Sequence, residues 1–227
     1  MADIVVQQPA QQAQQLFLLH HGVGATPQGL VPLGQRLAAV FPNALIVALQ
    51  SPFPSDFGQG FQWFSVQGIT EENRPARIAA VMPQFVQCVQ DWQVRSGVAP
   101  EATALIGFSQ GAIMALEASQ GEAHLAGRVV ALSGRYAQLP RAPHAHTTIH
   151  MVHGKNDGVI HYGYTVSGAE HLISLGADVT ADVIPFLGHE VNAEVVDTVL
   201  ERLQGHLPKR HWEAVHRAAE EEGGAED

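Results

Sequence analysis

The stretch that decides the fold is Thr103-Ala104-Leu105-Ile106-Gly107-Phe108-Ser109-Gln110-Gly111. Its first four residues form an apolar run typical of a strand buried on both faces of a parallel sheet. The last five match the pattern Gly-x-Ser-x-Gly, and Ile113, Met114 and Leu116 begin a helical apolar face directly after them. The motif alone is weak evidence. A strand before it and a helix after it, however, are the setting in which a reactive serine is presented at the end of a strand.

Similar apolar runs alternate with helical patterns along the rest of the chain. Further strands are predicted at Leu16–Leu19, Ala44–Leu49, Arg128–Leu132, Thr148–Val152 and Val179–Ile184, with an edge strand at Ile4–Val6. Helices are predicted at Gln28–Val40, Glu72–Ser96, Gln110–Ser119, Tyr162–Leu175 and Val191–Leu203. Pro83 is expected to kink or break the second helix. The alternation predicts an α/β fold, a doubly wound and mostly parallel sheet of about seven strands.

Length and composition limit the kinds of partner. The 227 residues fit a single domain over 1–227, with flexible ends expected at 1–15 and 221–227. A formal net charge of −10 disfavours nucleic acid and anionic membranes, so a small neutral or apolar molecule is the expected partner. The chain shows no signal-peptide pattern and no apolar stretch of the roughly 18–20 residues that span a bilayer. A cytoplasmic monomer or homodimer without integral membrane association is therefore expected.

An acid and a base for the serine follow later strands. A serine hydroxyl is a weak nucleophile near neutral pH and needs a histidine base, which an acidic side chain orients. Asp157 follows the strand at 148–152, and His189 follows the last strand in a glycine-containing loop. Asp178 and Asp182 are rival carboxylates, but they lie before or within the last strand, away from its carboxyl end. The sequence thus predicts a catalytic triad of Ser109, Asp157 and His189.

Backbone N–H groups beside the serine are expected to form an oxyanion hole. The loop after the strand at 16–19 contains Gly22-Val23-Gly24, and Gln110 directly follows the serine. In acyl-transfer enzymes, donors at these two places stabilise the developing negative charge. Val23 and Gln110 are the predicted donors.

Aromatic residues gather in one loop that is rich in proline and glycine. They are Phe53, Phe57, Phe61, Trp63 and Phe64. Such residues could line an acyl pocket, with Trp63 and Phe64 as substrate-binding residues. Anchoring of a long loop in the core explains them equally well.

No metal or cofactor is predicted, although the chain has 13 histidines. His144, His146, His150 and His153 cluster in sequence but straddle a loop and a strand, without a helical histidine pair supported by acidic neighbours. The single cysteine, Cys88, lies near the apolar face of the helix predicted at 72–96, where a buried structural thiol is expected.

With these residues identified, the chain resembles the carboxylesterase/lysophospholipase family of α/β-hydrolases, which includes acyl-protein thioesterases. The resemblance extends from about Leu16 to Leu203 and is closest to the small bacterial serine esterases. It rests on Leu19-His20-His21-Gly22-Val23-Gly24, Gly107-Phe108-Ser109-Gln110-Gly111, His153-Gly154-x-x-Asp157-x-Val159-Ile160 and Leu187-Gly188-His189-Glu190. Three positions depart from it. Ala25 stands where many members have Asp, Ala112 where many have Gly, and Ser65 follows Trp63-Phe64 in place of Asp.

The resemblance implies an α/β-hydrolase fold without a large cap domain. The function expected is that of a serine esterase hydrolysing carboxylic esters through an acyl-enzyme intermediate. Short to medium acyl chains are expected from the chain itself, because the segment between Leu132 and Thr148 is too short for a helical lid, whereas the thioesterase relatives accept long chains. Thioester hydrolysis is a second candidate. A non-catalytic scaffold that only binds a ligand is the alternative from another class, and the retention of all three triad residues argues against it.

Overall fold

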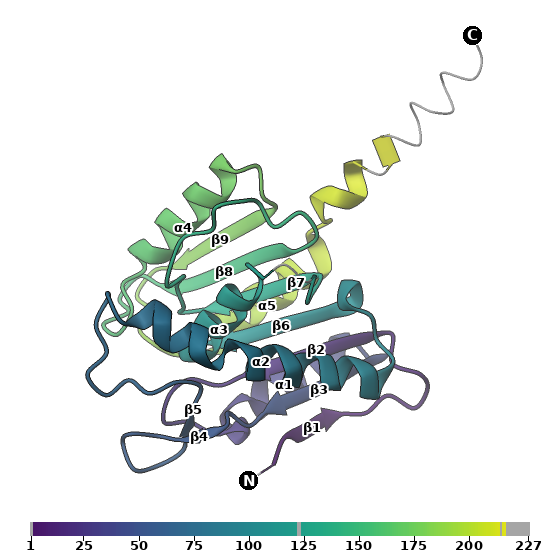
Figure 1. The fold of residues 1–227 in the computed structure, drawn as a ribbon. Helices are drawn as coiled ribbons and strands as arrows, with labels where there is room; N and C mark the ends of the chain where they lie inside the picture. Colours follow the sequence, from purple (N-terminus) through teal and green to yellow (C-terminus); the bar gives the residue numbers. More distant parts are fainter. Residues whose placement is uncertain (1, 122–123, 214, 217–227) are drawn as a thin grey trace, which may run out of the picture.

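A seven-stranded sheet forms the centre of the computed structural model, which describes residues 2–121, 124–213 and 215–216 (Figure 1). The strands lie in the order β1-β3-β2-β6-β7-β8-β9, and only β1, at one edge, runs antiparallel to its neighbour. Their bounds are β1 (Ile4–Gln7), β2 (Gln15–His20), β3 (Ala44–Leu49), β6 (Thr103–Phe108), β7 (Arg128–Leu132), β8 (Thr148–Gly154) and β9 (Val179–Ile184). The predicted mostly parallel sheet of about seven strands is confirmed.

The strand order reverses direction at one place, between β2 and β6. From β2 the chain adds β3 on one side, and from β6 it adds β7, β8 and β9 on the other. In an open parallel sheet, the loops that leave neighbouring strands on opposite sides of such a point diverge and leave a crevice at the carboxyl ends. The loop after β2 and the turn after β6 leave the sheet on the two sides of this point.

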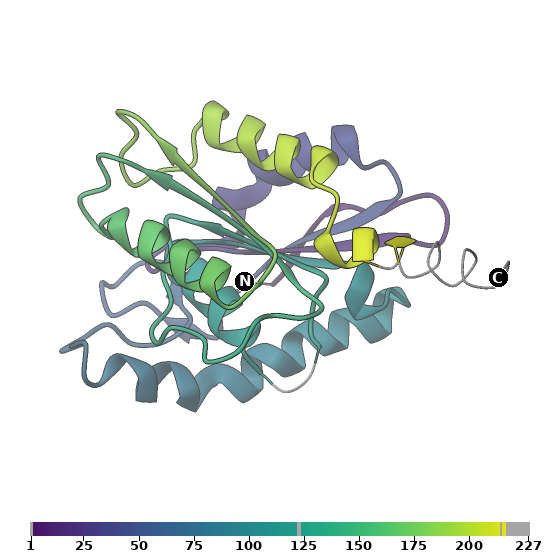
Figure 2. The same cartoon turned by 90° about the horizontal axis from the view of Figure 1, so that it is seen from above.

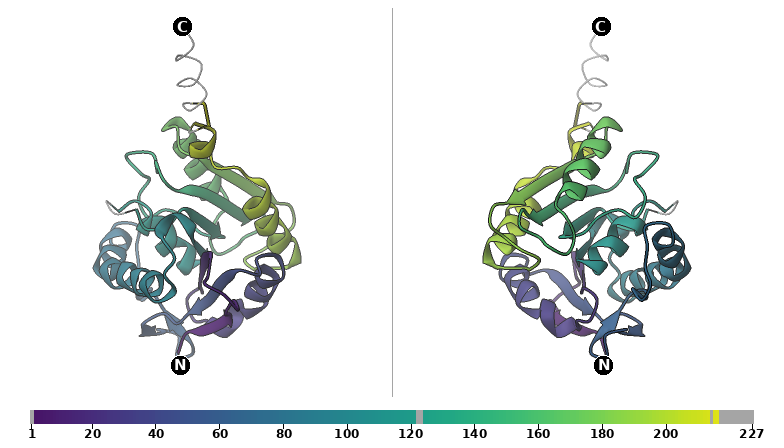
Figure 3. Two further views of the ribbon diagram at one scale, coloured as in Figure 1. Left: turned by 90° about the vertical axis from the view of Figure 1, so that its right-hand side faces the viewer. Right: turned by 90° about the vertical axis from the view of Figure 1, so that its left-hand side faces the viewer.

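Helices cover both faces of the sheet (Figures 2 and 3). One face carries α1 (Val31–Val40) and α5 (Ala193–Gly205), and the other carries α2 (Arg74–Ser96), α3 (Gln110–Ala118) and α4 (Gly163–Ser174). Two short 3-10 helices, η1 (Pro27–Leu30) and η2 (Pro100–Ala102), precede α1 and β6. Within the described ranges, no helix combines the length and the apolar character needed to cross a bilayer.

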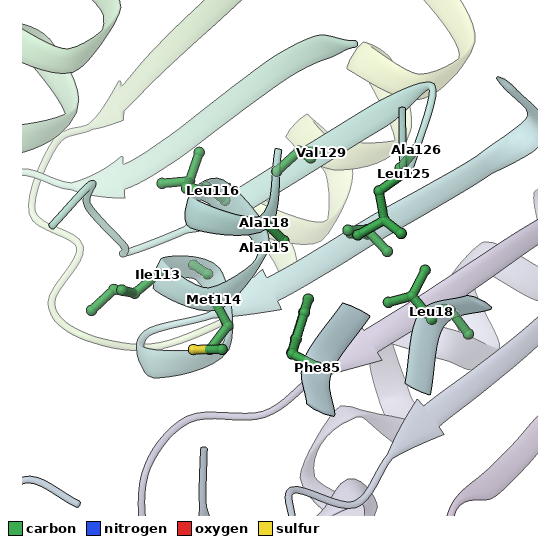
Figure 4. Close-up of a cluster of buried hydrophobic side chains, with 14 of the residues drawn as sticks. Leu18, Phe85, Ile113, Met114, Ala115, Leu116, Ala118, Leu125, Ala126 and Val129 are labelled. Atoms are coloured by element: carbon green, nitrogen blue, oxygen red, sulfur yellow. The ribbon is translucent and has the colours of Figure 1, made fainter. Parts of the chain in front are cut away.

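Each face of the sheet has its own apolar core. On the α2–α3–α4 face, Met114 and Leu116 of α3 and Phe85 of α2 pack above Leu18 of β2 and Val129 of β7 (Figure 4). On the α1–α5 face the core is built from the alternate side chains of the same strands. Burial of the strands on both faces explains why their sequences read as continuous apolar runs.

Three details differ from the sequence-based expectations. Helix α2 runs through Pro83 without a break. The missing hydrogen bond and the ring clash cost roughly 3 kcal/mol. Burial of Ile78, Phe85, Val89 and Trp92 on both sides of the proline offsets that cost.

The second difference is at the N-terminus. The sequence predicts both flexibility over 1–15 and an edge strand at Ile4–Val6, and the structure has a strand there, because β1 pairs with β3. At the other end, the chain is again helical over 209–213, and the expected flexible tail at 221–227 lies outside the described residues.

The third difference is an unpredicted hairpin of β4 (Phe53–Pro54) and β5 (Phe61–Gln62) within the aromatic loop.

Leu105→Ala should lower the free energy of unfolding by about 2–5 kcal/mol. Leu105 lies in β6, near the middle of the sheet, and its side chain is only 1% exposed, so truncation leaves a cavity. Urea denaturation monitored by circular dichroism measures the effect. Val94→Ala is the control, since Val94 is 82% exposed. Equal losses in the two variants would contradict the packing described above.

Candidate active site

Ser109 occupies a sharp turn between β6 and α3. Its backbone angles, φ 54° and ψ −116°, lie in a region that residues with side chains rarely adopt. A Cβ on Gly107 would lie 2.4 Å from the Ala112 nitrogen, and a Cβ on Gly111 would lie 2.1 Å from the His20 carbonyl oxygen. Both positions therefore require glycine. The two glycines of the Gly-x-Ser-x-Gly pattern are needed because any side chain there would clash with neighbouring backbone atoms.

Ala112 is one of the three positions at which this chain departs from the family pattern. The methyl group of Ala112 fits because the residue facing it across the turn after β7 is Gly134, where an added Cβ would lie 2.4 Å from the Ala112 Cβ. The departure therefore leaves the turn at Ser109 undisturbed.

The structure brings Ser109, His189 and Asp157 into one hydrogen-bonded chain. The Nε2 atom of His189 lies 2.9 Å from the Ser109 Oγ, and its Nδ1 lies 2.7 Å from the Asp157 Oδ2. A carboxylate only accepts, so Nδ1 carries the ring proton and Nε2 is free to accept the serine proton. This tautomer is the one that a general base for Ser109 requires.

Asp157 is buried and held in place by backbone donors. Its Oδ1 accepts hydrogen bonds from the backbone N–H groups of Val159 (2.8 Å) and Ile160 (2.9 Å). Burial by itself would raise the pKa of Asp157, but the hydrogen bonds from His189 and from these two amides outweigh it and keep the pKa below its usual range. The carboxylate is consequently ionised at neutral pH.

The loop that carries His189 is joined to the loop that carries Asp157. The backbone N–H groups of Lys155 and Asn156 donate to the carbonyls of Ile184 and Leu187. The imidazole packs on the ring of Phe108, with the two ring centroids 4.8 Å apart. The His189 side chain stays 17% exposed, so the imidazole remains partly open to solvent.

The two rival carboxylates lie elsewhere. Asp178 accepts hydrogen bonds from Thr148, at the amino end of β8, and from His206. Asp182 forms an ion pair with Arg202 of α5. The hydrogen bonds of Asp178 and Asp182 thus go to residues away from Ser109, whereas Asp157 contacts His189.

The expected oxyanion donors flank Ser109. A Cβ on Gly22 would lie 3.1 Å from the Ser109 Cβ, so the backbone that leads into Val23 passes directly beside the serine. Within the described ranges, the Val23 N–H donates to no protein acceptor. Gln110 is the first residue of α3, and an N–H at that position has no acceptor inside the helix. Both residues thus lie next to Ser109 in the fold, and their role as oxyanion donors stays a prediction.

The side chain of Gln110 has a role that the sequence did not reveal. Its Oε1 accepts a hydrogen bond from the Trp63 N–H (2.7 Å), and its Nε2 donates to the Phe64 carbonyl (2.7 Å). The residue after the serine thereby fixes the end of the aromatic loop. Nothing in the local sequence predicts it, because the partners are 46 and 47 residues away.

Trp63 and Phe64 are packed in the core. They are 3% and 2% exposed, and the Trp63 indole N–H donates to the His21 carbonyl. Core anchoring, one of the two interpretations left open by the sequence, describes their packing, and their expected role as substrate-binding residues stays a prediction. Phe57, 74% exposed at the tip of the hairpin, is the aromatic residue of this loop most open to solvent.

Asp56 organises the hairpin. Its carboxylate accepts hydrogen bonds from Gln62, from Ser65 and from the backbone N–H groups of Val66 and Gln67. These bonds, led by those from Gln62 and Ser65, lower the pKa of Asp56 to about 2. The hairpin is thus held by polar contacts beside a core-packed tryptophan.

The histidines that cluster in sequence do not converge in space. His150 contacts Arg128 and Thr180, His153 contacts Thr165, and His144 contacts Tyr136. In the part of the chain that the structure describes, no group of three His, Cys, Asp or Glu side chains could hold a metal ion. Cys88 is partly buried, and burial raises the pKa of its thiol to about 11.

A serine, a histidine and a carboxylate at the carboxyl edge of this sheet define the class of the protein as an α/β-hydrolase. A family model described as Phospholipase/Carboxylesterase matches residues 1–207, and the chain belongs to that family. It is therefore a carboxylesterase-type hydrolase, and the expected resemblance is confirmed.

Relatives and solved structures agree with this assignment. The chain is 49% identical over 209 residues to Esterase YpfH of Escherichia coli, covering 92% of this chain and 90% of that protein. It is 27% identical to Acyl-protein thioesterase 1 of Neurospora crassa, covering 83% and 85%. The crystal structure of esterase PE8 superposes with a TM-score of 0.77 at 27% identity, covering 88% of this chain and 97% of that one.

Gln110→Leu should destabilise the protein by about 2 kcal/mol or more. The substitution leaves the buried Trp63 N–H and Phe64 carbonyl without partners, and each such group costs about 1–3 kcal/mol. Gln87→Leu is the matched control, because the Gln87 amide bonds only Asp91 on the exposed face of α2. Thermal and urea unfolding would measure both variants. If Gln110→Leu were as stable as the control, the aromatic loop would not depend on this side chain.

Proposed function

We propose that this chain is a serine esterase in which Ser109 is the nucleophile, His189 the general base and Asp157 the residue that orients the base. The observation that carries the proposal is the pair of hydrogen bonds, 2.9 Å and 2.7 Å long, that link the three side chains at a strained turn. Unrelated structural serines lack this combination of a backbone outlier, an adjacent imidazole and a buried carboxylate.

In the proposed reaction, the Ser109 Oγ attacks the ester carbonyl carbon while His189 Nε2 takes the hydroxyl proton. The negative charge that develops on the carbonyl oxygen is stabilised by the backbone N–H groups of Val23 and Gln110. The imidazolium then gives its proton to the departing alcohol, which leaves an acyl-serine. Water, deprotonated by the same imidazole, attacks the acyl-serine, and the imidazolium returns the proton to the Ser109 Oγ as the acid leaves. Asp157 stays ionised throughout and stabilises the imidazolium.

The proposed substrates are small carboxylic esters of short to medium acyl chains. A relative 49% identical is named an esterase. No helix or strand lies between β7 and β8, over residues 133–147, where a helical lid could otherwise cover the crevice. Without a lid, the acyl group has only loops to contact. Thioesters are a second candidate class, since a relative 27% identical is named an acyl-protein thioesterase.

Ser109→Ala should reduce kcat for p-nitrophenyl acetate by about 10³-fold or more in a folded protein, and His189→Ala should cost about as much. The double variant should lose little more, because the two side chains act as a unit. Asp157→Asn should also be severe, because the amide favours the wrong imidazole tautomer. Initial rates with circular dichroism spectra as folding controls measure these effects.

A fluorophosphonate probe identifies the nucleophile independently of the substrate. Mass spectrometry should place the adduct on Ser109, and Ser167→Ala, an exposed serine on α4, should retain both labelling and activity. Labelling at another serine, or a lack of labelling with esterase activity intact, would refute the assignment of Ser109.

Catalytic efficiency should rise over the first few acyl carbons and then level off. Each buried CH₂ can contribute about 0.8 kcal/mol, but only while the protein still covers it. The measurement is kcat/KM for p-nitrophenyl esters from acetate to palmitate, below their micelle concentrations. An efficiency that keeps rising beyond about eight carbons would indicate an extended acyl groove instead.

A further inference from the structure

A second histidine contacts the carboxylate of Asp157. His153, near the end of β8, is completely buried, and its Nε2 lies 3.1 Å from the Asp157 Oδ2. This is the same oxygen that accepts the hydrogen bond from His189. The reaction as proposed above gives His153 no part.

The neighbours of His153 fix the position of its proton. Its Nε2 lies 2.8 Å from the Ile160 carbonyl oxygen, which can only accept, so Nε2 carries the hydrogen. Its Nδ1 lies 2.8 Å from the Thr165 Oγ1 and accepts the hydroxyl proton of that threonine. Burial lowers the pKa of His153, which keeps the ring neutral near pH 7.

We propose that His153 is a positioning residue for Asp157 and, through it, sets the basicity of His189. The inference rests on the proposed function. Two contacts carry it. The N–H of His153 bonds the Ile160 carbonyl, and so fixes the turn whose own N–H groups hold the Asp157 Oδ1. The same N–H group lies 3.1 Å from the Asp157 Oδ2, where its partial positive charge attracts the carboxylate.

The electrostatic environment makes this second contact consequential. Of the described ionisable side chains, those that face the Asp157 carboxylate are His189, from the loop after β9, and His153, from β8. The first turn of α4 contributes the Thr165 hydroxyl to the group, and β6–α3 contributes Ser109 beyond His189. A neutral N–H dipole aimed at Asp157 reduces the negative potential at His189. Removal of the dipole should therefore favour the protonated form of His189, which cannot act as a base.

The test is the pH dependence of kcat/KM for p-nitrophenyl acetate in His153→Leu and His153→Gln. Leu fills the site without a donor, whereas Gln places an amide N–H near the position of Nε2. His153→Leu should lower kcat at pH 7 by about 10-fold, the lower range for residues that orient a reactive group. It should also raise the midpoint of the acid limb by about one pH unit, because the N–H dipole 3.1 Å from the charged Asp157 Oδ2 is lost.

Several outcomes separate this role from a structural one. His153→Gln should restore the midpoint, and KM should change less than 2-fold in both variants, as expected when only transition-state interactions are lost. His150→Gln is the matched control, because His150 is an equally buried histidine on β8 that contacts Arg128 and Thr180. It should leave the pH profile unchanged. A folded His153→Leu variant with the wild-type midpoint would overturn the proposal.

Nuclear magnetic resonance of the wild-type protein gives a test that does not depend on whether the variants fold. With ¹⁵N-labelled histidine, His153 should be neutral and protonated on Nε2 from pH 5 to 9. A ring protonated on Nδ1, or one that titrates in this range, would contradict the proposal. Failure of the proposed function would instead appear as fluorophosphonate labelling at a residue other than Ser109. The two failures are therefore distinguishable.

Discussion

The strained turn at Ser109 is the constraint on which the rest of the site depends. A left-handed φ at a residue with a side chain costs on the order of 1–3 kcal/mol, and contacts with the surrounding structure must offset this cost. Here the Ser109 N–H donates to the Leu132 carbonyl of β7. The helix that follows begins so close to β2 that Gly111 touches the His20 carbonyl. The sheet and α3 together hold the serine hydroxyl out of the plane of the strand.

The reversal of strand order between β2 and β6 explains why the backbone of the proposed oxyanion donors lies beside the serine. Two neighbouring loops leave in opposite directions, so Gly22 can lie against Ser109 without a helix between them. Asp157 and His189 reach the same edge from β8 and β9, one and two strands beyond β7. Backbone hydrogen bonds between their loops fix the imidazole relative to the carboxylate. The orientation of His189 toward Asp157 thus depends on two loops at the carboxyl edge of the sheet rather than on a single loop.

Buried polar groups around the site are paired over long sequence distances. Gln110 bonds the backbone of Trp63 and Phe64, and His153 bonds the turn that holds Asp157. In a medium of low dielectric constant, each such bond is strong when made and costly when lost. These networks therefore specify one arrangement of the loops, in a protein where no lid element follows β7.

The sequence by itself determined the seven strands of the main sheet, the helices between them and the three residues of the proposed triad, since each depends on local patterns. Continuous apolar runs mark doubly buried strands, and glycines beside Ser109 mark a turn too tight for side chains. Tertiary structure alone decided the path of α2 through Pro83, the core packing of Trp63 and the roles of the Gln110 and His153 side chains. The physical reason is that burial energy and hydrogen bonds between distant segments override or complete local preference, and a single sequence does not encode which distant groups will meet.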